Sequence, residues 1–250
     1  MWGRVLTGGE VSAIVDPSAQ ANTSRDTVGD WLFNEGNGTY AYDSSAYYHD
    51  LTLNLDAGAG WTAAGHTGTA LALNGTGAAQ TSGPVINTDQ SFTVSAWVEL
   101  TGSVLPTTNM TILSQDGTRM SGFYLRYQIR SGTPSWCFST LDSDDASATW
   151  RPACTTSPVT TASLSTWVHL VGVFDAQSGA LALYVGGTRA DDGSGILQGR
   201  WNAGGPLVVG RSVWTPVGGA TQYADHVVGT IDDVTVYAGA MPSGDVPNLS

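Results

Sequence analysis

The sequence predicts an all-β protein, a two-sheet antiparallel sandwich of jelly-roll type, from its composition, its strand pattern and its turns. Lysine is absent and Glu occurs only three times in 250 residues, although both residues are favoured on exposed helices. Thr, Val and aromatic residues favour strands, and 32 Gly favour the turns between them. No segment shows a sustained apolar stripe at helical spacing, so strands are expected throughout.

The first predicted strands are short and are separated by turn signals. Gly29–Asn34 is an apolar run that stops at the turn 35–38, and Leu51–Leu55 and Ala70–Leu73 alternate in polarity, the latter before an Asn-Gly turn. Phe92–Leu100 alternates over nine residues, with Phe92, Val94, Ala96, Val98 and Leu100 on one face and Trp97 on the other.

The later predicted strands pair through recognisable turns. They are Met110–Ser114, then Gly122–Ile129 with Ser135–Thr140, then Thr166–Asp175 with Ala180–Val185, and finally Leu207–Val209 and Val227–Tyr237. The hairpin through residues 176–179 is the clearest pair. Together these strands are too many for one immunoglobulin module and suit a jelly roll.

The charge balance excludes several partners. The net charge is −12, and the nine basic residues, all Arg, form no run. A chain without a basic patch has little to neutralise phosphates, so we expect no nucleic acid partner. No run approaches the roughly 20 apolar residues that a membrane-spanning helix needs, so we expect no membrane insertion.

The chain is expected to hold one main domain with two tails. Residues 1–27 are predicted to be a linker or the tail of a preceding module, because the short alternating run Glu10–Asp16 stops at Pro17 and a polar stretch follows. The domain is expected over 28–241 and a C-terminal tail over 242–250. The first residues lack a signal-peptide pattern, and our hypothesis is a piece cut from a longer secreted polypeptide.

The two cysteines, Cys137 and Cys154, are seventeen positions apart. A metal or redox pair is disfavoured because there is no CxxC and no nearby His. We predict one disulfide that closes a hairpin loop, which indicates an oxidising compartment, secreted or at the cell surface.

Several spaced motifs resemble bacterial LamG-like (laminin G type) jelly-roll domains of the concanavalin A-like lectin/glucanase superfamily. The motifs are residues 31–38, 43–45, 68–71, 91–98, 167–175 and 229–237. The resemblance implies a concanavalin A-like sandwich, usually secreted and often one module among several. It also implies core positions for Trp31, Trp97 and Trp167.

Catalytic patterns are missing from the sequence. Glu10, Glu35 and Glu99 are scattered singly, and the acidic cluster 142–145 lies in a polar stretch where solvated loop acids are expected. The four His are isolated, there is no Gly-x-Ser-x-Gly motif, and His169 alternates within a strand. We therefore predict that the chain is not an enzyme.

The resemblance also implies a structural calcium ion, since related sandwiches commonly bind one. The matching ligands are Asp43 and Asp232, with Asp30, Glu35 and Asp233 as companions if the first and last strands are neighbours. The alternative is that these acids cap turns or accept hydrogen bonds from backbone amides.

Aromatic residues outside the clearest strands are candidate ligand-binding residues. Trp150, Trp201 and Trp214 lie in Gly-, Pro- or Ser-rich connections, where they either contact a ligand or anchor a loop. Tyr124 and Arg126 would add a polar patch if their strand faces the groove of the sandwich.

Three functions remain open on this evidence. The first is a non-catalytic recognition module that binds carbohydrate, or less readily an extracellular protein, with calcium ordering its loops. The second is a structural spacer or adhesion domain among other modules of the same polypeptide. The third and least favoured is a polysaccharide-degrading enzyme.

Overall fold

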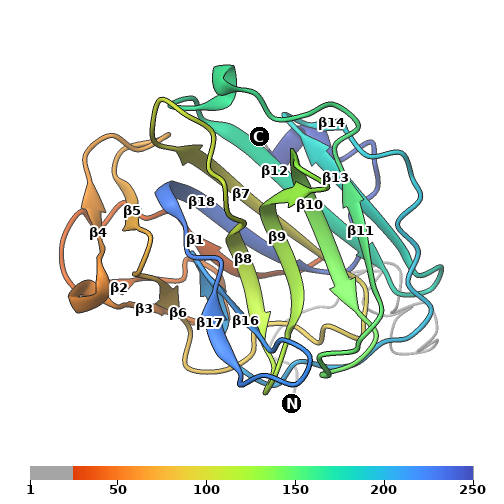
Figure 1. Ribbon diagram of the computed structural model, residues 1–250. Helices are drawn as coiled ribbons and strands as arrows, with labels where there is room; N and C mark the ends of the chain where they lie inside the picture. Colours follow the sequence, from red (N-terminus) through yellow and green to blue (C-terminus); the bar gives the residue numbers. More distant parts are fainter. Residues whose placement is uncertain (1–24, 250) are drawn as a thin grey trace, which may run out of the picture.

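The computed structural model describes residues 25–249 and shows a sandwich of two antiparallel sheets (Figure 1). The predicted tail at residues 1–27 lies almost wholly outside the described residues. The first sheet has the order β14-β13-β12-β7-β18-β5-β4, and β1 also pairs with β18. Its strands are β1 (Thr27–Trp31), β4 (Ala59–Thr62), β5 (Ala70–Asn74), β7 (Phe92–Leu100), β12 (Val168–Asp175), β13 (Ala180–Val185), β14 (Thr188–Arg189) and β18 (Val228–Ala238).

The second sheet has the order β11-β10-β9-β8-β15-β6-β3-β2. Its strands are β2 (Tyr40–Ala41), β3 (Leu51–Leu53), β6 (Ala79–Gln80), β8 (Met110–Asp116), β9 (Ser121–Arg130), β10 (Thr133–Leu141), β11 (Trp150–Cys154) and β15 (Leu207–Val209). Three short 3₁₀ helices, η1 (Leu55–Ala57), η2 (Thr161–Ser163) and η3 (Val246–Leu249), complete the described part. Within it, no helix is long and apolar enough to cross a membrane.

The core lies between the two sheets and is built from alternating strand residues. Phe92 of β7 is fully buried, and its ring centroid lies 5.1 Å from that of Phe123, 5.9 Å from that of Phe138 and 5.6 Å from that of Phe174. These four rings come from both sheets, so they join the layers directly. Because alternate residues of a strand point to opposite faces, polar side chains are directed to the outer faces.

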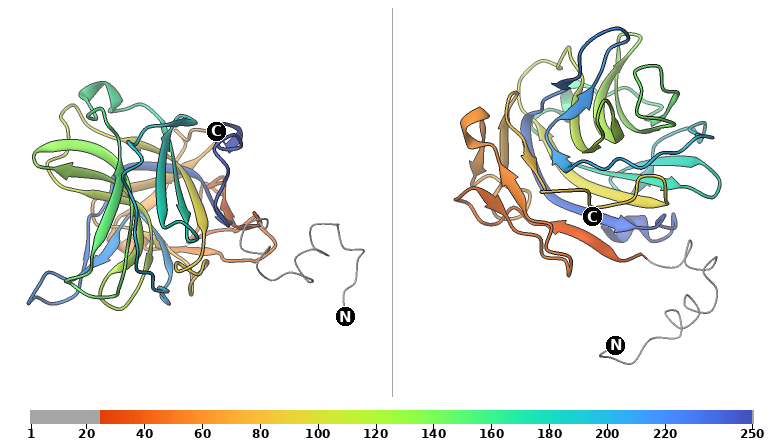
Figure 2. Two further views of the ribbon diagram at one scale, coloured as in Figure 1. Left: turned by 90° about the vertical axis from the view of Figure 1, so that its right-hand side faces the viewer. Right: turned by 90° about the horizontal axis from the view of Figure 1, so that it is seen from below.

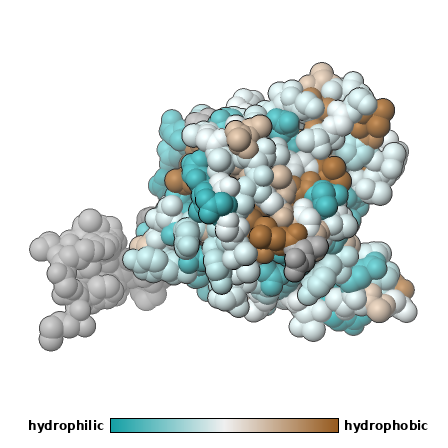
Figure 3. All heavy atoms as spheres, turned by 90° about the vertical axis from the view of Figure 1, so that its left-hand side faces the viewer, coloured by the Kyte–Doolittle hydropathy of each residue, from teal (hydrophilic) through white to brown (hydrophobic). Residues whose placement is uncertain are grey.

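The first strand ends earlier than its sequence pattern predicts. β1 stops at Trp31, because Phe33 has a φ of 48°, outside the range of a strand. The strand pairs with β18 through Gly29 and Val236, so the first and last strands are neighbours as expected. Loops and short strands follow on the β2–β4 side of the molecule, where apolar residues form only separated spots (Figure 3).

A two-stranded hairpin, β16 (Ser212–Trp214) with β17 (Gln222–Ala224), lies on the outer face of the second sheet over β8 and β9 (Figure 1). Polar side chains of that face bond to the backbone of β16. Ser114 Oγ donates to the Arg211 carbonyl over 2.9 Å, Tyr124 Oη to the Val213 carbonyl over 3.2 Å, and Ser121 Oγ accepts from the Val213 N–H over 3.0 Å. The loop that joins the two strands extends outward from the body (Figure 2, left, in blue).

Among the regions that the sequence predicts as connections, two that hold candidate tryptophans are strands. Trp150 begins β11, and Trp214 ends β16. β11 pairs with β10 with Cys154 opposite Cys137, and these cysteines form the predicted disulfide. The short strands β11 and β16 escape prediction because each is defined by its neighbour in the sheet rather than by its own alternation.

Two predicted core positions are wrong. Trp31 is buried in the core, but Trp97 lies on the outer face of the first sheet, stacked between His66 (centroids 3.6 Å apart) and His169 (5.0 Å). Trp167 is also only partly buried and meets the edge of the His66 ring. Trp97 points outward because it alternates along β7 with Phe92 and Val94, whose side chains point into the core.

His169 is a buried strand residue whose ring lies within hydrogen-bonding distance of Ser95, with Nε2 2.7 Å from the hydroxyl. Burial, together with a smaller effect of the nearby His66, lowers the pKa of His169 to about 4. In the unfolded chain this pKa is 6.5, so between the two values the unfolded state binds more protons than the folded state. The contribution of His169 to stability is therefore lost as pH falls from 6.5 to 4.

We predict that, between pH 7 and pH 5, the parent protein loses about 2 kcal/mol more of its free energy of unfolding than His169→Gln does. Urea unfolding at both pH values measures it. Burial also raises the pKa of Asp232 to about 6, which acts in the opposite direction, but this group is the same in both proteins and cancels from the difference. A difference that does not change with pH would show that folded His169 titrates normally.

Candidate functional site

The outer face of the second sheet carries a hollow of about 360 Å³ beside the β16–β17 hairpin. Its walls come from β9, β10, β11, the loop between β10 and β11, and the hairpin. The lining residues are Asn109, Met120, Tyr124, Arg126, Gln128, Leu141, Ala146, Ala148, Trp150, Trp214 and Asp225. We refer to this space as the Arg126 hollow.

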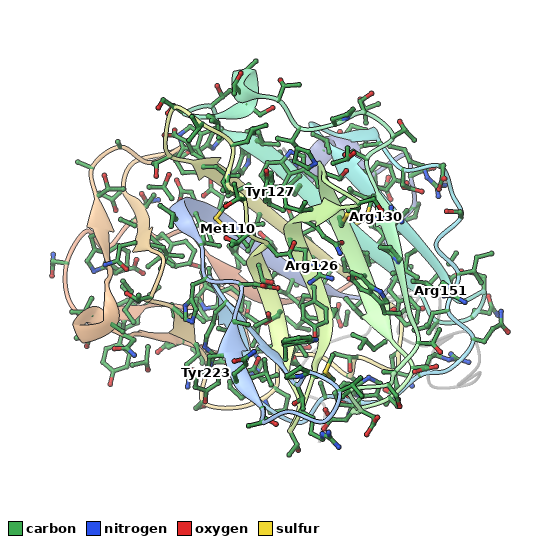
Figure 4. All side chains as sticks on the ribbon, in the orientation of Figure 1. Met110, Arg126, Tyr127, Arg130, Arg151 and Tyr223 are labelled. Atoms are coloured by element: carbon green, nitrogen blue, oxygen red, sulfur yellow. A yellow bond between two sulfur atoms is a disulfide. The ribbon has the colours of Figure 1, made fainter. Side chains whose placement is uncertain are left out.

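Arg126 lies at the floor of this hollow, in the middle of β9 (Figure 4). Arg126 is opposite Cys137 of β10 in the sheet. The disulfide from Cys137 to Cys154 joins β10 to β11, the next strand. The guanidinium carbon is 4.8 Å from the centroid of the Tyr124 ring and 4.4 Å from that of the Trp150 ring. Two aromatic rings therefore hold the planar group in one orientation.

Arg126 is paired with Asp225 through a long contact. The side chain is 6% exposed, and its ion pair with Asp225 has an N–O distance of 3.4 Å. Burial lowers the pKa of Arg126, and Asp225 opposes that shift. Burial likewise raises the pKa of Asp225, with Arg126 opposing, and raises the pKa of Tyr124 to about 12.

Polar atoms without a protein partner gather at this floor. Arg126 Nε and Gln128 Oε1 are buried and make no hydrogen bond to the protein, and both residues line the hollow. Ser139 Oγ, opposite Tyr124 in the sheet, is also buried without a partner. Because buried polar groups nearly always have partners, an unpaired donor beside unpaired acceptors indicates a place for a polar ligand or water.

The walls are held by contacts that the sequence does not reveal. Asp144 accepts hydrogen bonds from the backbone N–H groups of Thr118 (2.8 Å), Arg119 (2.9 Å) and Met120 (2.8 Å), which fixes the loop after β10 against the β8–β9 turn. The acidic cluster, expected to be solvated, thus has a member with a structural role. Asp225 has a φ of 56°, and its carbonyl accepts from the Thr111 N–H over 2.7 Å, so its backbone is anchored to β8.

Four of the five predicted ligand-binding residues line the Arg126 hollow: Tyr124, Arg126, Trp150 and Trp214. Trp201 is not among the lining residues. It packs with Met120, Tyr124 and Leu141, and a Cβ atom at Gly117 would lie 2.3 Å from its ring. Trp201 therefore supports the wall of the hollow from behind. Gln128 was missed, although its place two residues after Arg126 puts it on the same strand face.

The predicted calcium ligands are brought near one another but are used differently. Asp43 Oδ1 accepts from the N–H groups of Asp30 (2.9 Å) and Ser45 (2.8 Å), and Oδ2 accepts from the Ser45 hydroxyl (2.8 Å) and the His49 N–H (2.7 Å). Burial raises the pKa of Asp30, whose carboxylate accepts from the Thr235 hydroxyl.

The remaining carboxylates of this set also contact protein groups, although Glu35 Oε2 is buried without a hydrogen-bond partner. Asp232 accepts from the Thr67 and Asp233 N–H groups, Asp233 pairs with His66, and Glu35 accepts from the Tyr42 N–H. Within residues 25–249 no group of three or more His, Cys, Asp or Glu is placed to hold a metal ion. These donors therefore do not fit a calcium site in this conformation, and calcium stays a prediction.

Comparison with known proteins identifies relatives at the level of family and fold. The family described as the Concanavalin A-like lectin/glucanases superfamily matches residues 73–246. No curated protein sequence matches the chain.

Solved structures with the same fold include domains of larger proteins. Domain 4 of AbnA, an extracellular GH43 arabinanase from Geobacillus stearothermophilus solved with arabinotriose, has a TM-score of 0.65 and 18% identity, over 90% of this chain and 98% of that one. The binding domain of Paraclostridial Mosquitocidal Protein 1 has a TM-score of 0.65 and 15% identity, over 90% of this chain and 51% of that one.

The sialidase of Trypanosoma rangeli, solved with 2,3-difluorosialic acid, has a TM-score of 0.57 and 19% identity, over 88% of this chain and 32% of that one. The present chain thus spans about a third of the sialidase and about half of the toxin binding domain. At these identities the likeness shows the shared fold alone.

The hydrogen bonds of Asp43 predict how its loop responds to substitution. Asp43→Asn turns one acceptor oxygen into an amide nitrogen, which faces N–H or O–H donors and leaves at least one unpaired. We expect a loss of about 1–3 kcal/mol in the free energy of unfolding, equal in calcium and in EDTA. Urea unfolding in both buffers measures it; a calcium-dependent stabilisation that Asp43→Asn abolishes would instead place a metal ion at this loop.

Proposed function

The chain belongs to the Concanavalin A-like lectin/glucanases superfamily, and we propose that it is a non-catalytic recognition module that binds carbohydrate in the Arg126 hollow. The observation that carries this proposal is the floor of the hollow. There a fixed guanidinium, a carboxylate and unpaired polar atoms lie between aromatic rings. Sugars present hydroxyl groups that both donate and accept hydrogen bonds, together with apolar C–H faces. The polar atoms of the floor suit the hydroxyl groups, and the aromatic rings suit the C–H faces.

The charge distribution favours a neutral glycan. Arg126 is already paired with Asp225, so the floor is neutral overall, and the net charge of the whole chain is −12. An anionic polysaccharide would approach a protein of the same sign, which lowers the rate of encounter. The weak Arg126–Asp225 contact leaves donors and acceptors available to the hydroxyl groups of a neutral sugar ring.

The acids of the hollow support a non-catalytic role. Glycoside hydrolysis commonly uses two carboxyl groups about 5–9 Å apart across the scissile bond. The lining of the Arg126 hollow contains a single carboxylate, Asp225, and it is occupied by Arg126. The Ser95–His169 pair on the other sheet is buried, so a substrate does not reach it.

A place outside the cell, as one module of a larger polypeptide, accords with the disulfide between Cys137 and Cys154. The similar domain of the Geobacillus arabinanase is itself one numbered domain of an extracellular enzyme, and it was solved with a bound arabinan fragment. By this likeness, the glycan bound here is also the substrate of a neighbouring module of the same polypeptide. A structural spacer, the alternative function, would bind no sugar.

The proposal predicts binding that depends on Trp214. This side chain is 41% exposed at the rim of the hollow, so Trp214→Ala removes a stacking surface at little expected cost in stability. We expect the protein to bind at least one neutral glycan on an array that includes arabinan, xylan, β-glucan and mannan fragments. Isothermal titration should show about a tenfold or greater loss of affinity in Trp214→Ala and a smaller loss in Trp214→Phe.

Tyr42→Ala is the matched control, since Tyr42 is also an exposed aromatic residue, at 60%, but does not line the hollow. Its affinity should equal that of the parent protein. If no glycan binds, or if Trp214→Ala binds as tightly as the control, the carbohydrate proposal is wrong. Release of reducing sugar from any of these glycans would contradict the non-catalytic role.

A further inference from the structure

A second pair of hollows lies across the β16–β17 hairpin from the Arg126 hollow. One is about 420 Å³ and the other about 370 Å³, and they share Gln80, Arg211 and Tyr223. The Arg126 hollow is built on β9, β10 and β11. The larger of these two hollows is lined by the end of β8, the turn after it and the hairpin, the smaller one by β3, and both by Gln80 of β6. Figure 4 shows Tyr223 on the left strand of the hairpin and Arg126 to its right, over β9.

The groups at this second place repeat those of the first. Arg211 is 4% exposed, donates to Asp116 Oδ2 over 2.8 Å and to Gln80 Oε1 over 2.9 Å, and its guanidinium carbon is 3.9 Å from the centroid of the Tyr223 ring. The first site likewise has a buried arginine, an aspartate partner and aromatic rings over the guanidinium. An arrangement of this kind occurs once on each side of the hairpin.

The Tyr223 ring is oriented for contact with a ligand. One face of the ring lies over the guanidinium of Arg211, which holds it in place, yet the residue is 66% exposed. A fixed aromatic face that stays open to solvent offers stacking area at a low cost in side-chain entropy. Trp214 and Tyr223 are diagonal neighbours on the two strands of the hairpin, since Tyr223 pairs with Val213 and paired strands lie only about 5 Å apart.

We propose that the Arg211–Tyr223 hollows are a second subsite for the same glycan, so that the ligand is a neutral oligosaccharide that crosses the β16–β17 hairpin. The inference rests on the proposed carbohydrate function of the Arg126 hollow and adds the length of the ligand to it. Trp214 and Tyr223 then contact different sugar units of one chain. Both arginines are paired with aspartates, so neither subsite requires a charged sugar.

The test measures affinity against chain length by isothermal titration. The probes are neutral arabinan, xylan, β-glucan and mannan oligosaccharides from the disaccharide to the octasaccharide. For the parent protein we expect affinity to rise with length and then level off, with one oligosaccharide bound per chain at every length. Tyr223→Ala should lower the affinity for the long oligosaccharides about three- to tenfold and leave the affinity for the disaccharide unchanged.

Two further variants separate the second subsite from the first. Trp214→Ala should weaken the short and the long members alike, and Tyr42→Ala, exposed at 60% against 66% for Tyr223, should change neither. Tyr223→Phe keeps the ring and should retain the gain with length. Melting temperatures equal to that of the parent protein show that Tyr223→Ala is folded.

Each remaining outcome contradicts the inference in a recognisable way. If the glycan binds and Trp214→Ala weakens it but Tyr223→Ala leaves every length unchanged, the second subsite is wrong and the carbohydrate function stands. Two disaccharides bound per chain without any gain in affinity with length would show two separate sites, and the crossing ligand would be wrong. If no oligosaccharide binds at all, the carbohydrate function and the second subsite are both wrong.

Discussion

The shared apolar core between the two sheets decides where polar chemistry can occur in this protein. Phe92, Phe123, Phe138 and Phe174 fill the space between the layers, and every strand that contributes to this core must direct its alternate residues outward. The outer face of the second sheet therefore receives Tyr124, Arg126 and Gln128 from a single strand, β9, at every second position. A shift of one residue in this strand would place a guanidinium in the core, so core packing and the position of the site are one constraint.

A face that carries so many polar groups needs partners for them, and the β16–β17 hairpin supplies a large share. Ser114, Ser121 and Tyr124 bond to the backbone of Arg211 and Val213, which fastens the hairpin over the sheet, and Val213 itself is buried. The same hairpin separates the Arg126 hollow from the Arg211–Tyr223 hollows. Each side has a buried arginine, an aspartate partner and at least one aromatic ring over the guanidinium. A buried ion pair often stabilises a protein no more than apolar residues of similar volume would. The presence of two such pairs beside open hollows therefore favours a role in recognition over one in stability alone.

On the outer face of the first sheet, the same alternation places aromatic and polar side chains that stack on one another. There Trp97, His66 and His169 stack on one another, His169 is neutral at ordinary pH because burial lowers its pKa, and Asp232 is buried nearby. The carboxylates expected to bind calcium likewise accept backbone N–H groups, with four donors on Asp43 alone. On this side of the molecule, polar residues serve mainly to hold loops to the sheet.

The sequence by itself determined the fold class, the longest strands, the disulfide and the family. Phe92–Leu100 and Ala180–Val185 have the predicted bounds, because long alternation and turn residues are local properties of the chain. It also identified Tyr124, Arg126, Trp150 and Trp214 as candidates, from the rarity of charge and the wealth of aromatic residues. Only the tertiary structure decided that these four line one hollow, that Trp201 supports its wall, and that Asp225 pairs with Arg126 across 99 positions. The strands β11 and β16 also depend on it, since their hydrogen-bond partners lie on other segments, and contacts between distant residues leave no periodic mark in the sequence.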